Sequence, residues 1–430
     1  MTTTAHDNAR EAPPADVQRE PTRDERAEQI AKVTRQLDQR FSRQGEPLGP
    51  TRTLMNLDRI VKRDPWFRRR LAFNGLTEAV EWEGRRMRDE DVTRIRLAIA
   101  HTYGVEFGIE STHAVILETA RQLTYHPIVR YLKRLMWDRE PRINRFLTDY
   151  LGVEDTPLHR AISRRWFVAC VARAMGKGET PVKVDFVLIL VGPQGAMKST
   201  AFRVLASAPW FSDTPLDLRH GAREAYQSLR GTWLYELAEL ASLAPRSAET
   251  VKAFLSAPTD RYRPPYGRTV VESHRQCVFV GTTNAGQFLS DPTGSRRFLP
   301  VTVGEIQIDR IREDRDLLWA EALAAYRAGE VWWLSREEDA QLVEAQEQYQ
   351  HADPWIVVIE RWLLDPQNAQ EAARGMVVGD VLTRAIGMDT DRQRKGDEMR
   401  LSAVLQAMGW DKRRAQRNGK RARLWFPSAG

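Results

Sequence analysis

The stretch that most constrains the fold is an apolar run followed directly by a glycine-bearing loop. Residues 186–191 read Phe-Val-Leu-Ile-Leu-Val, and residues 192–200 read Gly-Pro-Gln-Gly-Ala-Met-Lys-Ser-Thr. A short, unbroken apolar run favours a buried strand of a parallel sheet. A strand that runs into a short loop ending in Lys-Ser is the layout of a phosphate-binding loop. The pattern therefore predicts an α/β core with a nucleotide site at the end of this strand.

The chemistry of this loop follows from its backbone and its last residues. Inward-facing amides form an anion-binding concavity, and a helix starting near Lys198 adds its positive end. Lys198 is expected to reach the outer phosphates, and Ser199 is expected to bind Mg²⁺. Met197 replaces the usual glycine, which is tolerable only if the backbone there avoids positive φ. The alternative is an ordinary strand, turn and helix with a solvated lysine. The residues assigned to the nucleotide are Gly192, Pro193, Gln194, Gly195, Ala196, Met197, Lys198, Ser199 and Thr200.

A second apolar strand, predicted over residues 231–239, ends in acidic residues. A carboxylate at the carboxyl end of a strand beside the loop is where Mg²⁺ needs an anionic ligand. Glu236 suits that role, and Glu239 suits the general base that polarises the attacking water. Alone, both could be exposed ends of an ordinary strand; beside the loop, the catalytic interpretation is preferred.

Two further strands carry the remaining catalytic candidates. Residues 276–284 are predicted to form an apolar strand that ends in Asn284. In ring-forming ATPases, which this order of motifs resembles, a polar residue at this place contacts the γ-phosphate or the attacking water. Arg296 and Arg297 stand immediately before an apolar strand at 298–301. An arginine there can stabilise transition-state charge in the site of a neighbouring subunit. The alternative for both arginines is a salt bridge or a solvated surface.

Two basic hairpins are the candidates for nucleic-acid binding, because arginines bind phosphates and tyrosines stack on bases. The first hairpin spans residues 260–275 and could equally be a structural loop with internal ion pairs. The second spans residues 412–426, with a packing module and solvated tail as its alternative. The residues assigned to DNA are Arg261, Arg263, Tyr266, Arg268 and His274 in the first hairpin, and Arg413, Arg414, Arg417, Lys420 and Arg421 in the second.

The chain of 430 residues is long enough for several domains, and 42% hydrophobic residues with 13 tryptophans support a substantial core. Its net charge of +7 is compatible with nucleic acid without proving it. Cys170 and Cys277 lie in apolar runs and are expected to be small core residues. No stretch is long enough to span a membrane, and a cytoplasmic protein is expected.

Four regions are predicted. Residues 1–45 are polar and expected to be a disordered tail, with helical character near 27–41. Residues 46–142 are expected to form a small α+β domain, with a helix capped by Ser111 and Thr112 and another over 128–137. Residues 143–350 are expected to form the ATPase domain, and residues 351–430 a winged-helix-like basic module.

The span from Gly192 to Val301 resembles the virulence-associated protein E family, phage and plasmid P-loop ATPases similar to superfamily 3 helicases. The resemblance rests on the loop at 192–200, Glu-Leu-Ala-Glu-Leu at 236–240, Asp-Arg-Tyr-Arg-Pro-Pro-Tyr-Gly-Arg at 260–268, Gly-Thr-Thr-Asn at 281–284 and Gly-Ser-Arg-Arg-Phe-Leu-Pro-Val at 294–301. It implies a ring-forming ATPase with an AAA+-like parallel sheet, usually hexameric, that uses ATP and Mg²⁺. By the same resemblance, the first basic hairpin lies in the ring pore and binds single-stranded or forked DNA.

The expected function is therefore a DNA-dependent ATPase, a replicative helicase of a phage, plasmid or other mobile element, with a primase or other replication protein as a candidate partner. One alternative is a DNA-binding initiator or loader that uses ATP for assembly without unwinding DNA. Another is a regulatory or anti-phage ATPase. Strand displacement on forked DNA separates the first two, and dependence on a phage component identifies the third.

Overall fold

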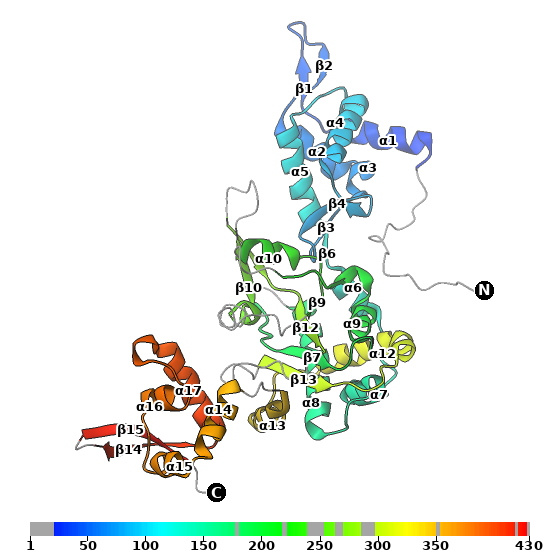
Figure 1. Cartoon of the computed structure of the whole chain (residues 1–430). Coiled ribbons are helices and arrows are strands. Elements are labelled where there is room, and N and C mark those ends of the chain that lie inside the picture. The colour runs from blue at the N-terminus through cyan, green and yellow to red at the C-terminus, as the bar shows by residue number, and fades with distance from the viewer. Residues whose placement is uncertain are drawn as a thin grey trace. The chain divides into compact units, whose positions relative to one another are not determined.

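The computed structural model describes the chain in two compact units, one extending to Tyr349 and the other starting at Gln350 (Figure 1). The described residues are 21–430, without 177–179, 217–221, 239–252, 263–269, 285–296, 350–352, 418–419 and 428–430. Among these residues, no helix combines the length and the apolar character needed to cross a membrane.

The first described segment is ordered, which corrects the prediction of a disordered tail for the part after residue 20. Helix α1 (Arg23–Thr34) begins with a capping box, in which Thr22 and Glu25 satisfy each other's backbone amides. The helix ends at Thr34, earlier than predicted, and a small antiparallel hairpin follows, formed by β1 (Gln39–Phe41) and β2 (Pro47–Pro50).

Residues 23–125, called the N-terminal lobe below, pack helices against a four-stranded sheet of order β5-β4-β3-β6. Its other elements are α2 (Leu54–Arg63), α3 (Pro65–Arg68), β3 (Leu71–Asn74), β4 (Ala79–Trp82), β5 (Arg85–Arg86), α4 (Asp89–Tyr103), α5 (Ile109–Gln122) and β6 (Thr124–Tyr125). The predicted caps of α5 are wrong, because Gly108 is the N-cap and the hydroxyls of Ser111 and Thr112 donate to its carbonyl instead.

The centre of the first unit is a five-stranded parallel sheet of order β13-β7-β12-β9-β8. The predicted apolar runs supply β7, β9, β12 and β13, although β9 is shorter than predicted, and the short β8 was not predicted. The strands are β7 (Val187–Val191), β8 (Phe211–Ser212), β9 (Leu234–Ala238), β12 (Val278–Thr283) and β13 (Phe298–Thr302). The antiparallel hairpin β10 (Thr259–Tyr262) and β11 (Val271–His274) precedes β12, as predicted.

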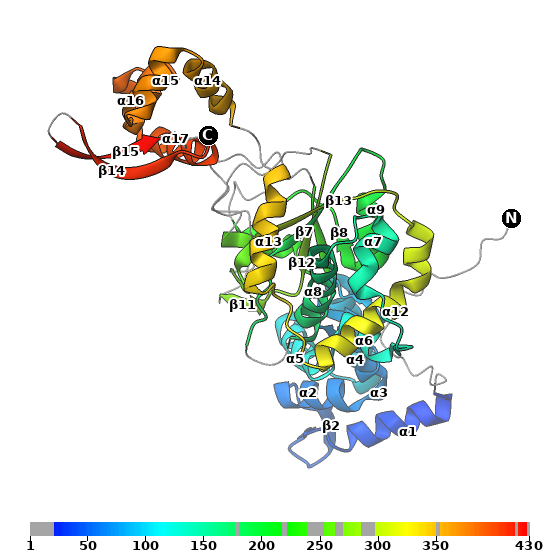
Figure 2. The ribbon, with the colours of Figure 1, turned by 90° about the horizontal axis from the view of Figure 1, so that it is seen from below.

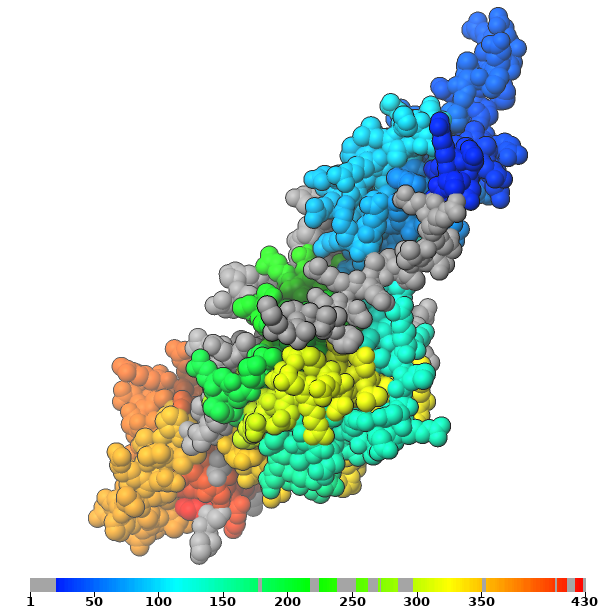
Figure 3. All heavy atoms as spheres, turned by 90° about the vertical axis from the view of Figure 1, so that its right-hand side faces the viewer, coloured from blue at the N-terminus to red at the C-terminus, as the bar shows by residue number. Residues whose placement is uncertain are grey.

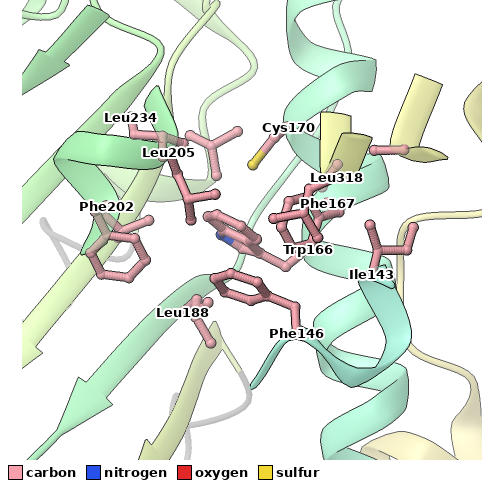
Figure 4. Close-up of a cluster of buried hydrophobic side chains, with 14 of the residues drawn as sticks. Ile143, Phe146, Trp166, Phe167, Cys170, Leu188, Phe202, Leu205, Leu234 and Leu318 are labelled. Carbon is pink, nitrogen blue, oxygen red and sulfur yellow. The ribbon is translucent and has the colours of Figure 1, made fainter. Parts of the chain in front are cut away.

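Both faces of this sheet are buried, which explains why its strands have no polar alternation. Leu188 and Leu190 of β7 face one cluster, whereas Val187, Ile189 and Val191 face another. The first cluster is centred on Trp166, which is fully buried among residues of α8, β7 and α9 (Figure 4). Cys170 and Cys277 are buried and unpaired, as expected for core residues.

Helices α8, α9 and α12 supply the covering residues of the first cluster, and α8 packs along α12 (Figure 2). Figure 3 shows the yellow atoms of α12 against the blue-green atoms of the preceding helices. Helix α6 ends at Arg134, three residues before its predicted end. The helices of this part are α6 (Pro127–Arg134), α7 (Phe146–Leu151), α8 (Pro157–Met175), α9 (Lys198–Ala206), α10 (Ala222–Ser228), α12 (Ile308–Arg327) and α13 (Arg336–Gln346).

The second unit has its own hydrophobic cluster, which includes Leu401, Leu405 and Trp410. Its hairpin, β14 (Asp411–Arg417) and β15 (Lys420–Phe426), confirms the predicted strands around a basic turn. An isolated bridge between Met376 and Trp425 connects this hairpin to the segment before α16. The helices are α14 (Pro354–Leu363), α15 (Pro366–Ala373), α16 (Val378–Arg384) and α17 (Lys395–Ala407).

Candidate active site

The loop at 192–197 connects the carboxyl end of β7 to the start of α9. The amide of Gly192 donates to the carbonyl of Thr283 on β12, with an N···O distance of 3.2 Å. A side chain at position 192 would meet the Cγ2 atom of Val303 at 2.8 Å, so that this close approach requires glycine. Helix α9 begins at Lys198 without a side-chain cap among the described residues. Its first amides are therefore suited to an anion.

Met197 has the left-handed backbone conformation, with φ 61° and ψ 22°. The sequence predicts that a side chain is tolerated at position 197 only where φ is not positive. The structure contradicts this expectation, because the φ of Met197 is positive. An L-residue in this region carries a cost of about 1–2 kcal/mol that glycine does not. The Met197 side chain is 51% exposed, so burial offsets only part of that cost.

Lys198 is held against the loop by three acceptors. Its Nζ donates to the carbonyl oxygens of Gly192 and Pro193, both at 2.8 Å, and to Oδ1 of Asn284 at 3.0 Å. Burial lowers the pKa of Lys198, and the nearby Glu236 carboxylate acts in the opposite direction. The two residues predicted to face the terminal phosphate, Lys198 and Asn284, are therefore in direct contact.

Glu236 is the buried acid of this site, with only 2% of the residue exposed. Its Oε1 accepts hydrogen bonds from Ser199 at 2.6 Å and from Thr282 at 2.5 Å. Its Oε2 is buried and has no hydrogen-bond partner among the described residues. Such an orphaned carboxylate oxygen requires a further explanation, and an ion that carries its own charge provides one.

The donor set at Glu236 fits a magnesium ion bound jointly with phosphates. Carboxylate and hydroxyl oxygens are ligands that Mg²⁺ prefers, and it keeps several waters or phosphate oxygens besides one or two protein ligands. Within the described chain, no three His, Cys, Asp or Glu side chains gather into a metal site. Ser199 and Glu236 therefore fit the one or two protein ligands that such an ion needs.

Thr282 is a member of this site that the sequence analysis did not single out. Thr282 lies in Gly-Thr-Thr-Asn, two residues before Asn284. Its position near the end of a buried strand is the sequence feature from which its place in the site could have been predicted. Because β12 pairs with both β7 and β9, its polar end reaches the loop and the acid together.

Arg297, one of the two arginines predicted to act in the site of a neighbouring subunit, lies at the amino end of the sheet strands. Arg297 directly precedes Phe298, which pairs with Val187 at the start of β7. The loop begins at the other end of β7. Arg297 and the loop are therefore separated by roughly 15 Å along the strand, at ~3.3 Å per residue. Arg297 donates to Ser256 Oγ at 2.8 Å instead. Glu239 and Arg296 lie outside the described residues.

The candidate DNA residues of the first hairpin are described only at its base. Arg261 is exposed on β10 opposite Glu272, and His274 is exposed at the end of β11. Arg263, Tyr266 and Arg268 lie outside the described residues.

In the second hairpin, Arg413 and Arg414 are exposed on β14. Arg417 pairs with Lys420 next to the turn, and Arg421 pairs with Gln416. The side chains of Arg417, Lys420 and Arg421 are not among those described.

Fold and site together define an α/β protein with a loop–helix junction and a buried carboxylate at the carboxyl edge of a parallel sheet. The model of the virulence-associated protein E-like domain matches residues 132–351, just over half of the chain. The chain belongs to this family, as the sequence motifs indicated.

Two of the solved structures that resemble this chain are forms of the NrS-1 C-terminal region. The apo structure of the NrS-1 C-terminal region (305–718) is 11% identical, with a TM-score of 0.45 over 83% of this chain and 96% of that chain. An A form of the apo NrS-1 C-terminal region is 14% identical, with a TM-score of 0.39 over 69% and 78%. A comparison with curated proteins finds no match.

Proposed function

We propose that this protein is a Mg²⁺-dependent ATPase that acts on DNA, in the manner of a replicative helicase of a mobile element. The observation that carries the proposal is the buried Glu236, which accepts from Ser199 and Thr282 and leaves its other oxygen without a partner. This arrangement lies beside Lys198 and the amide-lined start of α9.

The strand order supports a site of the ring-ATPase type. Strand β12, which Asn284 directly follows, lies between the loop strand β7 and the acid strand β9. In ring-forming ATPases, a polar residue at this place contacts the γ-phosphate or the attacking water. The contact of Asn284 with Lys198 is what such a role requires before a phosphate is bound.

Each residue then has a role that its chemistry allows. Lys198 and the loop amides hold the triphosphate, while Ser199 and Glu236 hold the ion. Mg²⁺, when bound, neutralises charge on the phosphate oxygens. Burial around Glu236 excludes water from that carboxylate, and Thr282 keeps it oriented. Glu239 remains the proposed base that orients the attacking water.

A second copy of the chain is part of the proposal. Arg297 stands at the amino edge of the sheet, so that it is separated from the loop of its own chain. Arg296 or Arg297 would therefore act in the site of a neighbouring subunit, which favours a ring, with a hexamer expected from the family.

DNA binding is proposed at both hairpins. The first would bind a single strand in the pore, and the second would be the wing of a winged-helix-like module. The helices α16 and α17, the bridge at Met376 and the β14–β15 hairpin support that module. Exposed Arg413 and Arg414 would contact phosphates.

The decisive experiment measures ATP hydrolysis with and without single-stranded DNA, on a sample whose mass is determined at the same time by light scattering. Stimulation by DNA in an oligomeric sample is expected. Lys198→Ala should abolish hydrolysis, and hydrolysis by this variant at the parental rate would show that the site is wrongly assigned.

A second function, an ATP-controlled DNA-binding initiator or loader, is favoured by one observation. The strained backbone of Met197 lies where the loop approaches phosphates, which could slow turnover while retaining binding. Displacement of a strand from forked DNA by the parent protein separates the two functions, since a loader would hydrolyse ATP without unwinding.

A further inference from the structure

The turn between β3 and β4 is inserted from the N-terminal lobe into the ATPase region. Leu76 at this turn is 3% exposed and belongs to the same cluster as Trp166 and Phe202. The side chain of Asn74 fixes the turn, because its Oδ1 accepts from the amides of Leu76 and Thr77. Figure 1 shows the β3 and β6 end of the lobe next to α10. The turn is therefore a rigid, anchored contact rather than a surface loop.

Glu78, the last residue of this turn, binds the base of the first hairpin. Its carboxylate accepts a hydrogen bond from Ser273 on β11 and forms an ion pair with Arg230, just before β9. The side chains of Glu78 and Arg230 are 22% and 29% exposed, so water screens this pair only in part.

The backbone of the same turn is bonded to the amino ends of two sheet strands. The carbonyl of Gly75 accepts from Nε2 of Gln276 at 2.8 Å, and the carbonyl of Leu76 accepts from the amide of Gly231 at 3.1 Å. His126 contacts the side chain of Gln276 at 2.6 Å. Gly231 and Gln276, which make these contacts, lie just before β9 and β12, the strands that end at the candidate site.

The hairpin itself is joined stiffly to β12. Arg275, which follows β11, has no exposed side-chain surface and forms an ion pair with Asp260 on β10. It also donates to the carbonyl of Phe254. These contacts tie the base of the hairpin, where Glu78 accepts from Ser273, to the segment that leads into β12.

Glu78 has an unusual backbone conformation that it shares with a second glutamate of the lobe. Glu78 has a φ of 50°, a left-handed conformation that a glutamate rarely adopts. Glu83 offers a matched comparison within the lobe, with a φ of 53° and an ion pair to Arg70 at 3.0 Å. Both glutamates have the same chemistry and backbone, but only the contacts of Glu78 described above reach the hairpin.

We propose that Glu78 is a positioning residue through which the N-terminal lobe fixes the base of the β10–β11 hairpin, and thereby sets how strongly DNA stimulates turnover. The inference rests on the proposed function, since it assumes that this hairpin binds DNA. The lobe would hold the hairpin in the position that DNA engages, and the amino ends of β9 and β12 would carry the response to the site.

The test compares Glu78→Gln with Glu83→Gln in the full-length chain. Glu78→Gln should keep the basal ATPase rate and raise the single-stranded DNA concentration for half-maximal stimulation by about fivefold, equivalent to ~1 kcal/mol. Glu83→Gln should match the parent in both measurements. The double variant Glu78→Arg with Arg230→Glu should recover part of the DNA response, because it restores an ion pair at the same place.

Hydrogen–deuterium exchange of the free protein gives a second, activity-independent measurement. Amides of residues 271–276 should exchange faster in Glu78→Gln than in the parent or in Glu83→Gln. Equal exchange and equal DNA response in the two single variants would overturn the role of Glu78. A parent protein that hydrolyses no ATP would overturn the proposed function instead, and the exchange difference would still test the contact.

Discussion

The unpartnered oxygen of Glu236 predicts that replacing this residue stabilises the protein while abolishing its response to nucleotide. Glu236→Gln keeps an oxygen that can accept from Ser199 and Thr282, but it removes a charge that is 98% shielded from water. The amide nitrogen that replaces Oε2 still has no partner among the described residues, so the substitution removes only the charge. A buried polar group without a partner costs about 1–3 kcal/mol, and more when it is charged. Loss of the attraction between Glu236 and Lys198 offsets part of this gain. We expect a net stabilisation of about 1 kcal/mol, or roughly 1–2 °C in Tm for a unit that extends to Tyr349.

The response to ligand should change in the opposite direction. A ligand present at 100 times its Kd stabilises the folded state by about 2.7 kcal/mol. The parent should therefore gain stability in Mg²⁺ and a non-hydrolysable ATP analogue, whereas Glu236→Gln should gain much less. Thermal unfolding followed by fluorescence, with and without Mg²⁺ and the analogue, measures both effects.

Glu321 provides the matched control for this experiment. It is also 2% exposed, but its oxygens accept from the amides of Arg142 and Ile143 and from the guanidinium of Arg164. Glu321→Gln should destabilise the protein by about 1–3 kcal/mol and keep the ligand response, because an amide would face donors. The reasoning would be refuted if Glu236→Gln were less stable than the parent without ligand, or if it kept the full shift with Mg²⁺ and the analogue.

Three further predictions concern other parts of the chain. Met197→Gly removes the left-handed strain and the side chain beside the expected phosphates, so calorimetry should show tighter ATP binding; weaker binding would contradict this interpretation. Arg85 lowers the pKa of Asp91 to about 2, so Asp91→Asn should cost about 1–2 kcal/mol at pH 7 after allowance for the exposure of Arg85. Because the folded pKa is depressed, that difference is present above about pH 4 and should shrink as pH falls towards 2 in urea unfolding; a constant difference would count against the ion pair. Replacing Arg413 and Arg414 by alanine should reduce the slope of log Kobs against log salt for DNA binding by about 2, and an unchanged slope would remove both arginines from the interface.

Local patterns were sufficient to predict the strands of the core except the short β8. The runs ending at Val191 and Thr283 are apolar without alternation because both faces of the sheet are covered, and this property is visible in the sequence. The contact between Lys198 and Asn284 was not predicted, although both residues follow buried strands and the carboxyl ends of parallel strands meet at one edge.

Features that depend on tertiary context could not be predicted in the same way. The conformation of Met197 is imposed by the turn into α9, and nothing in its side chain favours a positive φ. The contacts of Glu78 join residues separated by most of the ATPase region, so no local periodicity reports them. The distance of Arg297 from the loop depends on how β13 is aligned with β7, and the sequence alone does not determine that alignment.

The order of strands in the sheet has a consequence for how the chain is synthesised. Strand β7 is made early, yet its neighbours β12 and β13 come much later, with Val187 pairing with Phe298. At 5–20 residues per second, a ribosome needs roughly 5–20 s to proceed from the end of β7 to the end of β13. During that interval the Val-Leu-Ile-Leu-Val segment presents unpaired edges, which invite association with other chains. Nascent chains arrested before Phe298 should therefore depend on chaperones, whereas the N-terminal lobe, whose sheet closes within residues 71–125, can fold while the rest is still being translated.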